Sequence, residues 1–194
     1  MEKVSYALGL SLGNNLLGSG VTALVYAQLA KGIQDVMEQK QPDMSYQEAQ
    51  IVINEFFQEL QGKMSEKAQS EGIAFLAENA KRTGVTTLES GLQYEIIAAG
   101  NGILPKSTDT VKVHYHGMLI DGTVFDSSVD RGEPTSFGVT QVIAGWVEAL
   151  QLMQVGSKWR LFIPSDLAYG AQGAGQSIAP HSTLVFEVEL LEIV

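Results

Sequence analysis

Val111-Lys112-Val113-His114-Tyr115-His116-Gly117 alternates apolar and polar side chains, the period of two that is typical of a half-buried β-strand. The same period recurs in residues 92–97, 158–163 and 183–194, and turns containing Gly or Pro separate these stretches. This series predicts a twisted antiparallel sheet. Within it, the apolar residues 142–153 predict one short helix whose Trp146 faces the sheet across the core. The C-terminal region is therefore predicted to be α+β.

Residues 4–82 are predicted to be entirely helical, because no useful length of them alternates with period two. The clearest start signal is Ser45 followed by Glu48, a capping box. A helix from Tyr46 to Lys81 would be roughly 54 Å long at about 1.5 Å per residue. Residues 61–69 are largely polar, and Gly62 and Gly72 weaken a helix. We therefore expect the far half of this helix to be a bendable stalk without packing partners.

The first helices carry more apolar surface than two short helices can hide by themselves. Their apolar residues are Tyr6, Leu8, Leu10, Leu12, Leu16, Leu17, Leu24, Val25, Leu29, Ile33, Val36 and Met37. Such surfaces commonly close as two-fold dimers, so a homodimer is expected, and a monomeric three-helix cap is the alternative. We divide the chain into a helical dimerisation domain with its stalk at 1–84 and a sheet domain at 85–194. Residues 85–91 are expected to form the hinge.

The composition excludes several classes of function. A formal net charge of −10 at pH 7 argues against nucleic acid as a partner, because such binding depends on neutralising phosphates. The chain has no cysteine and so no disulfide framework. The N-terminus shows no signal peptide, and we expect no membrane span. The expected compartment is the cytoplasm, with the periplasm as the alternative if a leader was removed.

The sheet region carries five short motifs, each with an aromatic residue. They are Val113-His114-Tyr115-His116-Gly117, Asp121-Gly122-Thr123-Val124-Phe125-Asp126-Ser127-Ser128, Val142-Ile143-Ala144-Gly145-Trp146, Ala168-Tyr169-Gly170, and His181 to Leu190. In this order and spacing they resemble the FKBP-type peptidyl-prolyl isomerases from about Ser90 to Val194. The helical segment ahead of them resembles the dimeric Mip-like and FklB-like branch of bacterial FKBPs. The resemblance implies a curved antiparallel sheet wrapped round one short helix, with a pocket between them.

The resemblance also implies a function and a set of residues. It predicts an isomerase that accelerates Xaa-Pro rotation and assists the folding of proline-containing polypeptides. The residues implied in catalysis are Tyr115, Phe125, Asp126, Tyr169 and Phe186. The residues implied in substrate binding are Arg131, Phe137, Val142, Ile143, Trp146 and Ile178. No cofactor is implied. The runner-up is a holdase chaperone or adaptor whose isomerase domain is weak or inactive.

Some positions depart from the family pattern. Thr135 replaces a common aromatic and Gln141 an often acidic residue, so binding of a tacrolimus-like macrolide is a weaker expectation than isomerase activity. The loop 170–180 is expected to grip substrates from above, with Ile178 as an apolar contact. His114 and His116 have a spacing that can hold Zn or Ni, but a convergent third ligand is hard to find, so no metal site is predicted.

Overall fold

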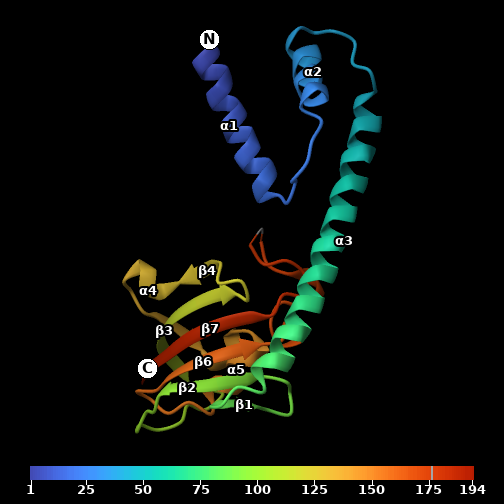
Figure 1. The fold of residues 1–194 in the computed structure, drawn as a ribbon. Helices are drawn as coiled ribbons and strands as arrows, with labels where there is room; N and C mark the ends of the chain where they lie inside the picture. The colour runs from blue at the N-terminus through green and yellow to red at the C-terminus, as the bar shows by residue number, and fades with distance from the viewer. Residues whose placement is uncertain (176) are drawn as a thin grey trace. The chain divides into compact units, whose positions relative to one another are not determined.

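The computed structural model describes residues 1–175 and 177–194. Contacts divide the chain into two compact units, Met1–Lys63 and Met64–Val194. The boundary falls inside one helix, α3 (Tyr46–Asn79), which runs from teal to green in Figure 1. No helix in these described ranges combines the length and the apolar character that crossing a membrane requires.

The first unit is helical, as predicted. It contains α1 (Glu2–Gly18), α2 (Tyr26–Met37) and the first half of α3. The helix α3 begins where the capping signal indicates, because Ser45 Oγ accepts the backbone N–H of Glu48 at 3.1 Å. Lys31 of α2 pairs with Asp35 at 2.9 Å and with Asp43 at 2.6 Å, which ties α2 to the loop that follows it.

The second unit is built on an antiparallel sheet, as the alternating stretches predict. Its strands are β1 (Val85–Thr87), β2 (Gln93–Ala98), β3 (Thr110–Leu119), β4 (Val124–Ser127), β5 (Thr135–Gly138), β6 (Lys158–Ile163) and β7 (Leu184–Ile193). They lie in the order β1-β2-β6-β7-β3-β4, with β5 also paired to β3. Figure 1 shows β2, β6, β7 and β3 side by side. The expected hinge at residues 85–91 begins instead with β1, which pairs with β2.

One face of the sheet packs on the short helix α5 (Ala144–Leu150), and this contact forms the core. Trp146, Ala149 and Leu150 of α5 are buried in one cluster with Val111 and Val113 of β3. Their burial confirms the predicted curved sheet wrapped round one helix. The even-numbered residues of β3 from Lys112 to Met118 project from the opposite face, as the alternation requires.

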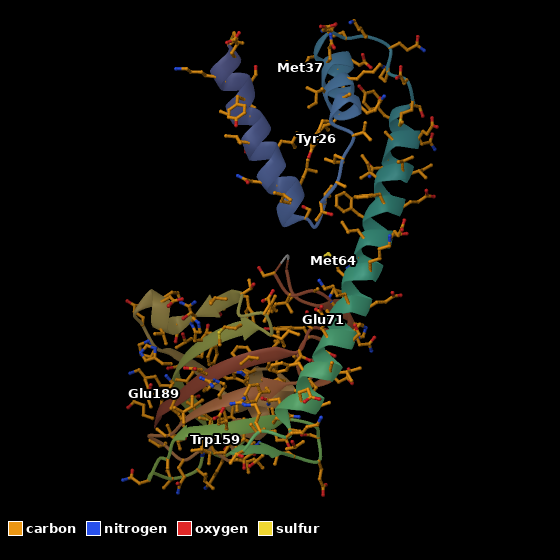
Figure 2. The ribbon with its side chains drawn as sticks, viewed as in Figure 1. Tyr26, Met37, Met64, Glu71, Trp159 and Glu189 are labelled. Atoms are coloured by element: carbon orange, nitrogen blue, oxygen red, sulfur yellow. The ribbon has the colours of Figure 1, made fainter. Side chains whose placement is uncertain are left out.

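The second half of α3 packs against the sheet, so the expected stalk without packing partners is wrong. The rings of Phe75 and Phe162 lie 5.9 Å apart, between their centroids. Asn79 is buried, and its amide donates to Gln93 Oε1 at 2.8 Å. Gln93 in turn donates to the Leu76 carbonyl at 2.9 Å. Met64 and Glu71, labelled in Figure 2, lie on this half of the helix. Contacts between residues so distant in sequence leave no periodic signal, which is why the sequence did not predict them.

Candidate active site

A cavity of about 400 Å³ opens between the sheet and the N-terminal end of α5. Strands β3, β4, β5 and β7, the turn before α5 and the loop after β6 each contribute to its wall. Its lining residues are Tyr115, Phe125, Asp126, Phe137, Gln141, Val142, Ile143, Trp146, Tyr169 and Phe186. Aromatic and aliphatic side chains predominate, and Asp126 is the single ionisable carboxyl group of the lining. The cavity is therefore suited to a small apolar ring.

Trp146 forms the floor of the cavity. It is 4% exposed, and its ring meets those of Tyr115, Phe137 and Phe186 at centroid distances of 5.6, 5.9 and 5.3 Å. The three interplanar angles lie between 81° and 88°. Such edge-to-face pairs are each worth about 0.5–1.5 kcal/mol beyond burial. The rings therefore hold one another in place and give the floor a defined shape.

Gly117 makes room for two of the walls. It pairs with Asp126 of β4 on one side and with Phe186 of β7 on the other. A Cβ atom at this position would lie 2.7 Å from Phe186 Cε1 and 2.8 Å from Phe125 Cε2. The edge-to-face contact of those two rings, at 5.4 Å, thus depends on a residue without a side chain. We did not predict a site role for Gly117, although a glycine inside a strand is a signal of close approach.

A hydrogen-bonded trio lies at the mouth of the cavity. Tyr115 Oη donates to Asp126 Oδ2 at 2.5 Å, and Arg131 Nη2 donates to Tyr115 Oη at 2.9 Å. Arg131 also donates through Nη1 to the other carboxylate oxygen of Asp126. The guanidinium carbon lies 5.6 Å from the centroid of the Tyr115 ring. These contacts fix the direction of the Asp126 carboxylate.

The trio also sets the charge of its members. Burial raises the pKa of Tyr115, and the hydrogen bond to Asp126 raises it further. For Asp126, burial is the largest single influence and raises the pKa. The hydrogen bonds from Tyr115 and Arg131 together outweigh it, so the pKa of Asp126 falls below its ordinary value of 3.8. Asp126 is therefore an anion at neutral pH, and Tyr115 keeps its proton.

The structure brings most of the predicted site residues together in the cavity lining. Those in the lining are Tyr115, Phe125, Asp126, Phe137, Val142, Ile143, Trp146, Tyr169 and Phe186. Arg131 lies outside the lining and reaches the site through Asp126 and Tyr115.

Two residues differ from the expectation for the site. Ile178 is 6% exposed, pairs with Ala174 through two backbone hydrogen bonds and packs on the core instead of lining the cavity. Gln176 of the same loop lies outside the described residues. Gln141, which the sequence indicated only as a departure from the family pattern, lines the cavity. Its Oε1 accepts the Gly138 backbone N–H at 3.3 Å, a contact across a single turn.

The two histidines of β3 each face a serine. His114 Nδ1 lies 3.1 Å from Ser128 Oγ, and His116 Nδ1 lies 2.8 Å from Ser127 Oγ. Within the described ranges, no group of three or more His, Cys, Asp or Glu side chains is placed to hold a metal ion.

Comparison with known proteins identifies the family. A family model described as FKBP-type peptidyl-prolyl cis-trans isomerase matches residues 102–191, and one described as the domain amino-terminal to that isomerase matches residues 1–96. The FKBP-type 22 kDa peptidyl-prolyl cis-trans isomerase of Escherichia coli K12 is 51% identical, over 98% of this chain and 94% of the relative. The chain belongs to the FKBP-type peptidyl-prolyl cis-trans isomerases. The function and enzyme class predicted from the motifs are thereby confirmed.

Other FKBP relatives agree over nearly the whole chain. The outer membrane protein MIP of Legionella longbeachae is 44% identical over 99% of this chain and 85% of its own. The solved structure of FkpA from Escherichia coli superimposes with a TM-score of 0.75 and 41% identity, over 98% of this chain and 95% of that one. An isomerase structure from Pseudomonas syringae pv. tomato has a TM-score of 0.62 and 43% identity, over 66% of this chain and 95% of that one. The predicted fold is confirmed. The expectation of a cytoplasmic protein finds no support among these relatives.

Proposed function

We propose that the aromatic cavity binds the prolyl ring of an Xaa-Pro segment and that catalysis takes place at its mouth. One observation carries the proposal. A rigid apolar floor around Trp146 and a fixed carboxylate, Asp126, lie in the same cavity. The floor suits the ring of proline, and the carboxylate lies where the polar amide next to that ring would emerge.

The chemistry asked of this cavity is rotation, with no covalent bond to carbon made or broken. Amide resonance sets a barrier of about 18–20 kcal/mol to that rotation. A catalyst lowers the barrier when it binds the twisted amide more tightly than the planar one. The twisted carbonyl has lost resonance and carries less negative charge, so its transfer from water to an apolar cavity costs less. Aromatic walls thus favour the transition state over the ground state.

Polar groups at the rim orient the peptide. Tyr169 is 40% exposed and donates its phenolic hydrogen to a substrate carbonyl in this proposal. The backbone N–H of Ile143, at the N-cap of α5, supplies a second donor. Asp126 makes a polar contact with the substrate, and Arg131 supports Asp126 from outside the cavity. Holding the chain on both sides of the prolyl bond leaves rotation about that bond as the free movement.

The two tryptophans provide a direct test of where substrate binds. Trp146 lines the cavity, whereas Trp159 stacks on Tyr94 with ring centroids 4.2 Å apart, away from it. Titration with an Ala-Leu-Pro-Phe tetrapeptide is followed through the two indole N–H signals in an NMR spectrum of the ¹⁵N-labelled chain. We expect the Trp146 signal to shift and the Trp159 signal to stay. A shift confined to Trp159 would place the binding site elsewhere.

We further propose that the helical unit joins two copies of the chain. Helix α1 has no buried residue, and the exposed fractions of Tyr6, Leu8 and Tyr26 are 71%, 67% and 77%. A monomeric three-helix cap would bury these side chains within its own unit, so their exposure favours a second copy as their cover. Two joined copies present two cavities, and a protein client held by one meets the other at a high effective concentration.

Light scattering of the full chain and of residues 64–194 tests the dimer. We place the cut after Lys63 rather than Gly84 because α3 packs on the sheet from there on. We expect the full chain to be a dimer and residues 64–194 to be a monomer. Both should have equal activity per site on tetrapeptides, but the shorter chain should accelerate the refolding of proline-limited proteins less. A monomeric full chain that suppresses aggregation would instead favour the holdase alternative, in which the exposed helices bind unfolded chains.

A tacrolimus-like macrolide is proposed as a competitive ligand of the same cavity. Thr135 is not among the lining residues, so the position at which an aromatic residue is common contributes nothing to the wall here. Inhibition of tetrapeptide turnover by tacrolimus, compared between the chain and a Thr135→Phe variant, tests this. We expect tighter inhibition of the variant.

A further inference from the structure

His116 lies on the face of β3 opposite the cavity. Tyr115, its neighbour, is buried beneath the cavity mouth, and alternation along the strand turns His116 away from it. The imidazole meets Ser127, its register partner on β4, with Nδ1 at 2.8 Å from Ser127 Oγ. Ser127 is 5% exposed. His116 therefore has no direct access to substrate, and its hydrogen bond toward the site is the one to Ser127.

Ser127 controls the short helix that carries Arg131. Its Oγ accepts the backbone N–H of Asp130 at 3.0 Å and so caps α4 (Ser128–Arg131). Arg131 at the end of that helix holds Asp126 and the hydroxyl of Tyr115. A helix of one turn has few hydrogen bonds of its own, so its direction depends on the cap. A continuous set of contacts thus joins His116 to the polar trio at the cavity mouth.

The protons of this set can be counted. Ser127 has one hydroxyl hydrogen, and its oxygen already accepts from Asp130. In the described part of the chain, His116 Nδ1 is the acceptor placed to take that hydrogen. Nδ1 must then be unprotonated and the imidazole neutral, with its hydrogen on Nε2. A protonated imidazole would donate to Ser127 instead and leave the buried hydroxyl hydrogen without a partner.

Two carboxylates face His116 from the neighbouring elements, and His114 lies two residues away on its own strand. Asp130 Oδ2 of α4 lies 3.8 Å from Nδ1, and Glu187 of β7 is paired with His116 in register. Glu187 already pairs with Arg160 at 2.6 Å and Lys158 at 3.2 Å. An imidazolium would therefore attract chiefly Asp130, the residue whose N–H forms the cap. Protonation of His116 would therefore affect both residues of the cap, Ser127 through its hydroxyl and Asp130 through its carboxylate.

We propose that His116 is a positioning residue for the isomerase reaction. As a neutral acceptor it orients Ser127, and through the cap of α4 it holds Arg131 against Asp126 and Tyr115. The proposal rests on the function proposed above for the cavity. Histidine is the side chain that ordinarily changes charge between about pH 5 and 8. The trio of Tyr115, Asp126 and Arg131 should therefore be most ordered when His116 is neutral.

The test measures kcat/KM of the full chain on an Ala-Leu-Pro-Phe tetrapeptide between pH 5 and 8. NMR exchange spectroscopy follows the reaction, so no coupled protease is needed. The variants are His116→Ala, which removes the acceptor, and His116→Asn, whose amide oxygen accepts from Ser127 but does not titrate. One hydrogen bond is worth about 0.5–1.5 kcal/mol, so His116→Ala should lower kcat/KM roughly two- to tenfold at pH 8. His116→Asn should restore it at pH 8 and show a smaller decline toward pH 5 than the unaltered chain.

His114→Asn is the matched control. His114 also faces a serine, but Ser128 does not cap α4, so this variant should keep the decline toward pH 5. The proposal is overturned if His116→Ala matches the unaltered chain at pH 8, or if His116→Asn declines with pH as the unaltered chain does. If His116→Ala does not fold, the profile of His116→Asn decides alone. Inactivity of the unaltered chain would instead refute the function proposed for the cavity, so the two failures are distinct.

Discussion

Gly72 on α3 lies directly against Thr183, the residue before β7. A Cβ atom at Gly72 would come 2.4 Å from Thr183 Oγ1 and 3.1 Å from Thr183 Cβ. Thr183 is 5% exposed and has little room to withdraw. The glycine that weakens α3 as a helix is therefore the residue that lets α3 approach the sheet.

Gly72→Ala should destabilise the isomerase unit. Helix propensity alone predicts a gain of about 1 kcal/mol, but overpacking against Thr183 typically costs about 1–3 kcal/mol. Gly62→Ala is the matched control, because no atom lies within 4 Å of a Cβ at that position, and it should not destabilise the chain. Urea unfolding of both variants measures the difference. Equal stabilisation by the two substitutions would show that α3 is not packed on Thr183.

Hydrogen exchange should divide α3 at a particular place. Amides between Gly72 and Asn79 are expected to exchange slowly, because Phe75 and Asn79 anchor this segment to the sheet. The polar segment 61–69 should exchange faster, since it includes the boundary between the compact units. Residue-resolved exchange by NMR tests both statements. Fast exchange throughout 72–79 would restore the bendable stalk that the sequence suggested.

Gly117→Ala adds only one methyl group but should reshape the cavity. The added methyl group would meet the rings of Phe125 and Phe186, which cannot both keep their places. We expect kcat/KM on a proline tetrapeptide to fall at least tenfold in a chain that remains folded by circular dichroism. Gly122→Ala is no suitable control, because Gly122 has a φ of +86°. Ala144→Gly, at the first residue of α5, is used as the control instead, because it is a small change near the cavity that adds no atom.

Tyr169→Phe and Phe186→Ala should differ in size of effect. Tyr169 loses one hydrogen bond to substrate, worth about 0.5–1.5 kcal/mol, so turnover should fall roughly two- to tenfold. Phe186 is a buried wall of the cavity, and its removal costs about 3–5 kcal/mol of stability as well as the shape of the site. Turnover by Phe186→Ala should therefore fall further than by Tyr169→Phe. Unchanged turnover in both would place the catalytic pocket elsewhere.

The sequence predicted what depends on short motifs and missed what depends on contacts between distant segments. Alternation in residues 111–117 and the N-cap at Ser45 are local, and both appear in the structure as expected, the cap through the bond from the Glu48 N–H to Ser45 Oγ. The aromatic residues of the cavity other than Phe137 were found because each stands in one of the five motifs. The packing of Gly72 on Thr183 joins residues far apart in the chain, and the local sequence of neither segment predicts the contact. The role predicted for Ile178 stays a prediction: an apolar residue in a loop can face the core as well as a ligand, and Ile178 packs in the core cluster.

The low pKa of Asp126 predicts how its contribution to stability depends on pH. The pKa is lower in the folded chain than its ordinary value of 3.8, so the contribution is complete above that value and is lost as pH falls through the folded pKa. The difference in unfolding free energy between the chain and Asp126→Asn should thus be constant from pH 5 to 7 and shrink below pH 3.8. Urea unfolding at each pH measures it. A difference that grows on acidification would mean that the trio favours a protonated Asp126.

Catalysed exchange of a prolyl bond is the most direct test of the account. Uncatalysed, the bond isomerises over tens to hundreds of seconds. NMR exchange spectroscopy of an Ala-Leu-Pro-Phe tetrapeptide, with a small amount of the full chain added, measures the rate on the peptide itself. We predict an exchange rate that rises in proportion to the chain added and is largely lost with folded Asp126→Leu. An exchange rate equal to that in buffer, or one that Asp126→Leu leaves unchanged, would contradict the assignment of catalysis to this cavity.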